Sequence, residues 1–235
     1  MPNILDGLAV LLPIKQKCQI CGKAPHPDRT TTEKKEDKGC LKSIPKNLGC
    51  SAIAVNPALP NYATAAHHLI PANQCLKKFR RLSKMCKTVG YDVNNKENGI
   101  ALPTCGQQSM NSYTDKKLKY GKLSDEDKQN VAFIIMEGLN KQWHVGHHNW
   151  KIDLKTDSER HPENYDKLVK TKLRDIEKDI AANGNSICNP KSGESGKKVI
   201  TKLNNLSKRI RKKVESWDKY FVSAKAYEYA KKYEK

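Results

Sequence analysis

Two histidine clusters constrain this chain more than any other feature of its sequence. Five of its seven histidines form the pair His67 and His68 and the group His144, His147 and His148. Neutral imidazole is the commonest metal ligand in proteins and the natural general base near pH 7. A fold that uses both clusters must bring together segments that are separated by 75 residues.

The residues around the first cluster predict two short strands separated by a helix. An extended stretch runs through His68, a helix covers about residues 73–87, and a second extended stretch covers residues 99–102. Successive side chains of a strand point to opposite faces, so one of His67 and His68 can bind a metal while the other reaches toward a phosphate.

The second cluster predicts a chelating pair. Ser124 has the form of a helix cap, and the helix that it starts leads toward His144. His144 and His148 are four residues apart, which places both rings on one side of a helix, whereas His147 points elsewhere. The order of strand, strand and metal-binding helix predicts a mostly helical α+β chain with a small ββα-metal (His-Me finger) core.

The charge of the chain indicates a polyanionic partner. The formal net charge is +19, from 44 Lys and Arg against 25 Asp and Glu, and it is spread along the sequence. Nucleic acid is the polyanion that such a field attracts most readily. No segment reaches the roughly 18 apolar residues of a membrane-spanning helix. The stretch at residues 4–14 lacks the basic leader and cleavage site of a Sec signal peptide, so we expect a soluble chain. Together with the histidine clusters, the charge predicts a metal-dependent nuclease with little sequence specificity.

The cysteines leave three interpretations open. Cys18 and Cys21 form a CxxC pair, which is half of a zinc site. Cys40 and Cys50, with His26 as a substitute, would complete a structural zinc site; a disulfide and ordinary free thiols are the alternatives. Three regions follow from this pattern: an irregular, zinc-stapled segment at 1–60, a nuclease core with a helical insertion at 61–160, and a basic helical hairpin at 161–235. Cys75 and Cys86 are expected to be buried in the core.

The hairpin combines an apolar stripe with a basic surface. Apolar residues recur at helical spacing from Val199 to Ala224 and predict one long helix packed on a helix at 163–183. Residues 197–235 hold 13 basic and 4 acidic side chains, a surplus of nine. The basic side is either a solvated surface or a face that binds phosphate or an inhibitor. The candidate phosphate-binding residues are Lys151, Arg209, Arg211 and Lys212.

Four runs together resemble a known family. Ala66-His67-His68-Leu69-Ile70-Pro71 is followed by Tyr91-Asp92-Val93-Asn94, by Glu97-Asn98-Gly99-Ile100-Ala101-Leu102-Pro103 and by the cluster at 144–148. Over about residues 60–150 the chain resembles the AHH family of HNH/endonuclease VII nucleases. The resemblance implies that His67, His144 and His148 bind the metal, that His68 is the general base, and that Asn98 braces the loop between the strands. His147 is an alternative to His148, and His161, in the run His-Pro-x-x-Tyr at 161–165, is an alternative ligand or substrate-binding residue.

The resemblance also implies a biological setting. Many members of the family are toxin domains of bacterial effectors. The chain would be made in the bacterial cytoplasm as part of a parent effector polypeptide. A secretion apparatus such as a type VI system would deliver it to the cytoplasm of a target cell, and an acidic immunity protein would neutralise it. The metal would be Mg, Mn, Ni or Zn, and the substrate DNA. An RNase on the same scaffold and a noncatalytic, zinc-stabilised nucleic-acid-binding protein are the alternatives.

Overall fold

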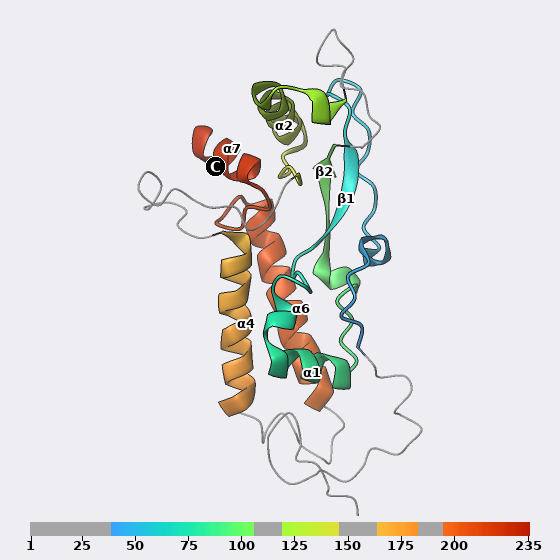
Figure 1. The fold of residues 1–235 in the computed structure, drawn as a ribbon, viewed down its shortest axis with the longest axis vertical. Coiled ribbons are helices and arrows are strands. Elements are labelled where there is room, and N and C mark those ends of the chain that lie inside the picture. Colours follow the sequence, from blue (N-terminus) through green and yellow to red (C-terminus); the bar gives the residue numbers. More distant parts are fainter. Residues whose placement is uncertain (1–38, 106–118, 146–163, 183–194) are drawn as a thin grey trace, which may run out of the picture.

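The fold is a two-stranded antiparallel sheet packed beside helices. The computed structural model describes residues 39–105, 119–145, 164–182 and 195–235, and the fold is α+β as the sequence predicts (Figure 1). The elements are, in order, η1 (Pro45–Leu48), β1 (Ala63–His68), η2 (Leu76–Lys78), α1 (Arg80–Thr88), η3 (Lys96–Asn98), β2 (Gly99–Thr104), η4 (Tyr120–Lys122), α2 (Asp125–Leu139), α4 (Tyr165–Ala182), α6 (Ser195–Glu215) and α7 (Ala224–Lys232).

The two strands lie where the sequence predicts them. β1 pairs with β2 in antiparallel register, so that His67 is opposite Ile100 and His68 is opposite Gly99. Between them the predicted single helix is wrong in one respect, because Phe79 (φ −99°, ψ 89°) interrupts it and separates η2 from α1. Phe79 packs against the core, and the free N–H of Leu82 is capped from another helix by the Glu177 carboxylate at 3.0 Å.

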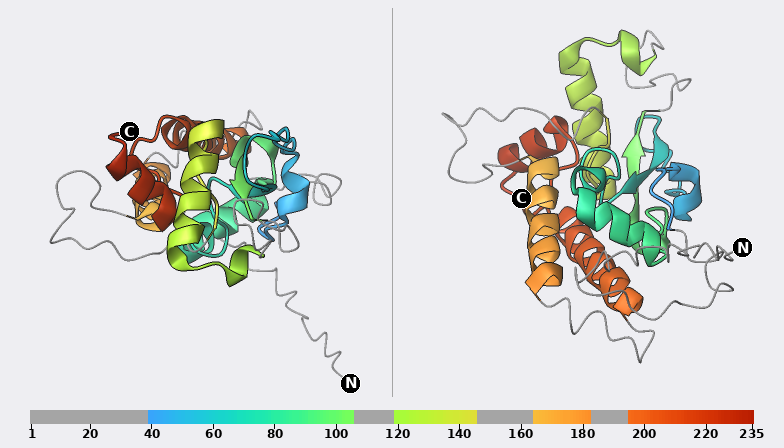
Figure 2. Two further views of the ribbon diagram at one scale, coloured as in Figure 1. Left: turned by 90° about the horizontal axis from the view of Figure 1, so that it is seen from above. Right: turned by 60° about the horizontal axis from the view of Figure 1, so that its bottom comes forward.

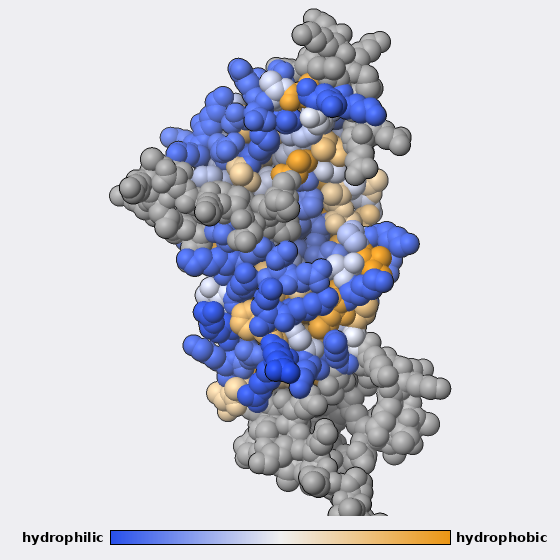
Figure 3. All heavy atoms as spheres, viewed as in Figure 1, coloured by the Kyte–Doolittle hydropathy of each residue, from blue (hydrophilic) through white to orange (hydrophobic). Residues whose placement is uncertain are grey.

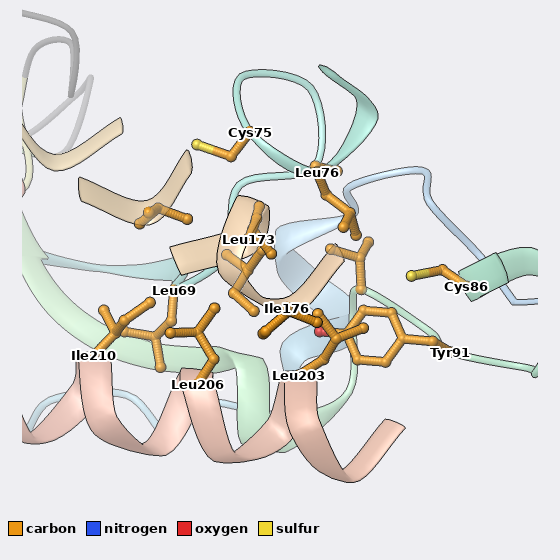
Figure 4. Packing of buried hydrophobic residues seen from close by; sticks show 14 of the residues in the cluster. Leu69, Cys75, Leu76, Cys86, Tyr91, Leu173, Ile176, Leu203, Leu206 and Ile210 are labelled. Atoms are coloured by element: carbon orange, nitrogen blue, oxygen red, sulfur yellow. The ribbon is translucent and has the colours of Figure 1, made fainter. Parts of the chain in front are cut away.

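α4 and α6 form the expected hairpin and cover the sheet and α1. Figure 4 shows side chains from α4, α6, α1, the segment between β1 and α1 and the loop before β2 meeting in one core, and the views in Figure 2 place α4 beside α6. Cys75 and Cys86 are buried in this core as free thiols, as the sequence predicts. Leu41 in the irregular segment before β1 belongs to the same core.

Helix α6 ends earlier than its apolar stripe. The prediction of one helix through Ala224 is wrong, because α6 ends at Glu215 and the chain turns before α7. Trp217 and Lys219 have φ values of 59° and 67°, a left-handed conformation that no helix continues through. The turn carries Trp217 and Phe221 into a second core against α2 and α7.

Helix α2 begins at the residue that the sequence predicts. The Ser124 hydroxyl accepts a hydrogen bond from the backbone N–H of Asp127 at 3.0 Å and caps the helix. The helix ends at Asn140, which adopts the left-handed conformation (φ 47°).

Hydrophilic side chains cover most of the face in Figure 3, and apolar ones show only in small patches. None of the helices in the described part of the chain is long and apolar enough to span a membrane.

Candidate active site

The two adjacent histidines border one pocket at the end of β1. His67 is 2% exposed and His68 is 9% exposed, and both line a hollow of about 230 Å³. His144 lines the same pocket, together with side chains of the segment after the strand. Although both histidines belong to β1, where successive side chains alternate between faces, the two residues border the same pocket.

The structure brings His144 to His67 along β2 and not along a helix. The His144 N–H donates to the Pro103 carbonyl at 2.8 Å, and the Thr104 hydroxyl donates to the His144 carbonyl at 2.8 Å. The predicted helical position of His144 is therefore wrong, because residues 141–145 are irregular and extend beside the strand. His147, His148, Lys151 and His161 lie outside the described residues.

The C-terminal turn holds the segment that carries His144. Gln142 is 1% exposed, and its amide nitrogen donates to the carbonyls of Val214 and Tyr220 at 2.9 and 3.1 Å. Its amide oxygen accepts from the Val222 N–H at 2.9 Å. The position of His144 therefore depends on the turn between α6 and α7.

His67 and His144 face each other through ring nitrogens. His67 Nδ1 lies 3.0 Å from His144 Nε2, and the ring centroids are 4.7 Å apart. Two imidazole nitrogens on one ion, with bonds of 2.0–2.1 Å, are about 2.9 Å apart at an octahedral angle and about 3.3 Å apart at a tetrahedral one. The observed separation therefore fits two ligands of one cation.

Tyr165 fixes which nitrogen of His67 carries the proton. The Tyr165 hydroxyl donates its one hydrogen to the Leu69 carbonyl at 2.6 Å, so it can only accept from His67 Nε2, which lies 3.3 Å away. Burial raises the pKa of Tyr165, which keeps this hydrogen in place at neutral pH. His67 is consequently the Nε2–H tautomer, and its Nδ1 lone pair points toward His144.

Asn94 fixes the tautomer of His68 in the same way. The Asn94 amide nitrogen donates to the Lys42 carbonyl at 2.9 Å, and its oxygen accepts from the Ile44 N–H at 2.7 Å, so the orientation of the amide is determined. His68 Nε2, at 3.1 Å from this oxygen, must be the donor. The Nδ1 lone pair of His68 is left as the basic site. Burial lowers the pKa of His68, against an opposing effect of Asn94 and Asp92, and so favours the neutral, basic ring.

Asn98 joins the two ends of the loop between the strands. It is fully buried, and its amide group bonds to the N–H and the carbonyl of Ile70 at 2.8 and 3.2 Å and to the Val93 carbonyl at 2.8 Å. The Ser207 hydroxyl of α6 donates to the same amide oxygen at 2.9 Å. These contacts hold the turn after His68 against the start of β2.

The donor set around the pocket is imidazole nitrogen. Among the described residues no group of three His, Cys, Asp or Glu side chains is arranged to hold a metal ion. Without a metal, the His144 Nε2–H donates to the His67 Nδ1 lone pair. If His144 gave up this hydrogen, the two imidazole nitrogens would suit a divalent transition metal, and water and phosphate would complete its shell.

Two of the four candidate zinc cysteines belong to the described residues. Cys40 and Cys50 are half-buried free thiols; Cys40 lies 3.8 Å from the Asn94 amide nitrogen, and Cys50 is next to Arg211, which opposes the rise that burial causes in its pKa. Cys18 and Cys21 lie outside the described residues. A structural zinc site therefore stays a prediction.

Of the candidate phosphate-binding residues, Arg209 and Lys212 are exposed on α6, whereas Arg211 has a structural contact. Its Nη2 atom donates to the carbonyls of Lys96, Glu97 and Gly99 at 3.0, 3.2 and 2.6 Å. Arg211 therefore joins α6 to the corner where η3 meets β2.

Sequence reasoning did not assign roles to Asn94 and Tyr165. Asn94 belongs to a run that carries the family resemblance, and Tyr165 ends the His-Pro-x-x-Tyr run at 161–165; these are the signals by which they could have been found. Their contacts with the histidines span 26 and 98 positions, so no local pattern specifies them.

Comparison with known proteins gives one match. Residues 51–210 match a family model described as a nuclease family of the HNH/ENDO VII superfamily with conserved AHH. The Ala66-His67-His68 run at the pocket provides that tripeptide. No curated protein and no solved structure matches the chain.

Proposed function

Because the chain belongs to the AHH family of nucleases in the HNH/endonuclease VII superfamily, we propose that it hydrolyses phosphodiester bonds of DNA in the pocket formed by His67, His68 and His144. One observation carries the proposal: both members of the histidine pair border this pocket, and hydrogen bonds from other elements give each the same tautomer.

His68 is the general base of the proposed reaction. Its Nδ1 lone pair accepts a proton from the attacking water as the new bond to phosphorus forms and the bond to the leaving oxygen breaks. Asn94 accepts the Nε2–H bond throughout and stabilises the ring as its charge rises. The environment that keeps His68 neutral at pH 7 keeps it competent for this step.

His67 and His144 are the proposed metal ligands, with His148 as the third and His147 or His161 as alternatives. A divalent cation held by these residues would supply charge neutralisation at the phosphoryl group and at the leaving oxygen. Tyr165 orients His67 for this role, and Gln142 positions the segment that carries His144. Mg, Mn, Ni and Zn are the candidate metals.

The charge of the protein supports a nucleic-acid substrate that is held through its phosphates. A net charge of +19 attracts any duplex. Phosphate contacts fix register without reading sequence. We therefore propose cleavage with little sequence specificity.

The same charge supports a biological proposal. We propose that the chain is an antibacterial toxin, delivered by a secretion apparatus or within a parent polypeptide, and that an acidic immunity protein blocks it by charge-steered association. Expression in a bacterial host should arrest growth in the wild type and not in His68→Ala, and co-expression of the immunity protein should restore growth.

The direct test is incubation with supercoiled plasmid and, separately, with total RNA. Mg, Mn, Ni and Zn are added in turn, with a chelator control. We expect metal-dependent nicking of the plasmid that is lost in His68→Ala. His68→Gln, which keeps a donor that can reach Asn94, should fold like the wild type and should also be inactive. Cleavage of RNA but not of plasmid would show that the substrate is RNA. Binding of nucleic acid without cleavage under any of the metals would show that the protein is a binding protein and not an enzyme.

A further inference from the structure

A second hollow lies on the strand next to the histidines. It has a volume of about 570 Å³ and is bordered by residues 48–51, by η3, by the first half of β2 and by α6. Gly99 and Ile100 of β2 line it, and these residues pair across the sheet with His68 and His67. Neighbouring strands are about 4.8 Å apart, so the backbone that borders the second pocket lies one strand spacing from the backbone that carries the histidines.

Positive charge dominates the lining of this second pocket. Lys96, Lys141, Lys208 and Arg211 border it, against Glu97 and Glu215. In the described part of the chain, no carboxylate forms an ion pair with any of these three lysines. Their charge is therefore not paired by a carboxylate of the described residues.

The wall that carries Lys96 is held rigidly. Arg211 donates to the carbonyls of Lys96, Glu97 and Gly99, which joins η3 and the start of β2 to α6. These carbonyl oxygens would repel an anion, but they already accept hydrogen bonds from the Arg211 guanidinium. Lys96 and Lys208 consequently project from two elements whose relative position is fixed.

We propose that this pocket binds the backbone phosphates of the nucleic-acid strand beside the scissile bond, through Lys96, Lys141 and Lys208. The proposal rests on the proposed nuclease function and names the site through which the substrate leaves the histidine pocket. A concave, basic surface concentrates polyanions more strongly than a flat one of equal charge. The ligand is a phosphodiester chain, and base identity has no part in it.

Salt-dependent binding tests the proposal without cleavage. Binding of a labelled DNA duplex is measured by fluorescence anisotropy in the presence of a chelator. The salt concentration is varied between about 50 and 300 mM, where phosphate contacts weaken. The pocket variant combines Lys96→Gln, Lys141→Gln and Lys208→Gln. A control variant with the same change in net charge combines Lys87→Gln, Lys122→Gln and Lys178→Gln, which lie on α1, η4 and α4, line neither pocket and form no ion pair with another described residue.

Each lost phosphate contact reduces the slope of log affinity against log salt by about 0.9 on duplex DNA. We expect the pocket variant to lose about 2 to 3 from the slope and the control variant less than about 1. The substitution Glu215→Gln, within the same pocket, should strengthen binding. Equal losses in the two triple variants would overturn the proposal, because the lysines would then act only through the overall field.

Two further outcomes separate this proposal from the proposed function. If the wild type never cuts nucleic acid but the pocket variant binds it with a smaller slope, the pocket is a phosphate site and the hydrolytic function fails. If the wild type cuts plasmid while the pocket variant keeps the wild-type slope, the nuclease function stands and the pocket proposal fails. A pocket variant that loses only binding to an acidic protein would also refute it.

Discussion

Removing the Tyr165 hydroxyl should weaken the metal site without emptying it of ligands. In Tyr165→Phe the ring still fills its place in the core, where the Tyr165 side chain is fully buried. The substitution removes only the 3.3 Å contact with His67 Nε2 and the 2.6 Å bond to the Leu69 carbonyl. His67 then loses the acceptor that selects its Nε2–H tautomer.

The magnitude follows from these two contacts. Loss of the hydrogen-bond partner of a ligating histidine typically costs 10-fold to 100-fold in metal affinity, about 1.4 to 2.7 kcal/mol. The buried Leu69 carbonyl also loses its donor, which should lower the free energy of unfolding by about 1 to 3 kcal/mol. The two effects are separable, because one depends on metal and the other does not.

Calorimetric titration with Mn and Zn measures the first effect, and urea unfolding in a chelator measures the second. The ¹⁵N resonances of His67 in the metal-free protein report its tautomer directly. Tyr62→Phe is the matched control, since the Tyr62 hydroxyl also donates to a carbonyl, that of Ala54, and accepts from an N–H, that of Asn56. Wild-type metal affinity in Tyr165→Phe, with an unchanged His67 tautomer, would refute the reasoning.

Three other changes have defined outcomes. The pKa of His68 is lowered by burial, so its basic form persists as pH falls through the usual histidine range; the acidic limb of kcat/KM should lie below that range, and an acidic limb above it would contradict the assignment. Asn98→Ala should lower the free energy of unfolding by about 2 to 5 kcal/mol in urea titrations, because buried backbone groups lose their partners. Gln142→Ala should lower the free energy of unfolding by about 2 kcal/mol or more in urea titrations and should lower metal affinity in calorimetric titrations, because three hydrogen bonds to the backbone that hold the His144 segment disappear. A change in stability alone would show that His144 is held by other contacts.

Local signals in the sequence were sufficient for the elements that carry the histidine pair. The extended run that ends at His68, the second strand and the cap at Ser124 depend on residues within a few positions of each other. Such features are specified by backbone preference and short-range hydrogen bonds, which the chain carries wherever it packs. The same applies to the apolar stripe of α6, whose residues are buried as predicted.

Apolar periodicity gave a wrong prediction of where α6 ends, because a longer helix and a turn with buried rings produce the same pattern. The apolar series continues beyond Glu215 through Trp217 and Phe221 as it would in a longer helix. The chain instead turns through left-handed residues, because burial of these rings against α2 and α7 offsets the unfavourable conformation at Trp217. A helical pattern records which residues are buried, and it does not record the element that buries them.

The sequence by itself determined the candidate reacting groups of this protein: a pair of histidines at the end of β1, a bracing asparagine directly before β2 and a strongly basic chain. Only the tertiary structure decided how those groups are oriented. Tyr165 and Asn94 select the tautomers of His67 and His68, and the turn after α6 fixes the segment of His144. The reason is physical: a tautomer depends on the atom that each ring nitrogen faces, and these atoms come from distant segments that meet only when the core has formed.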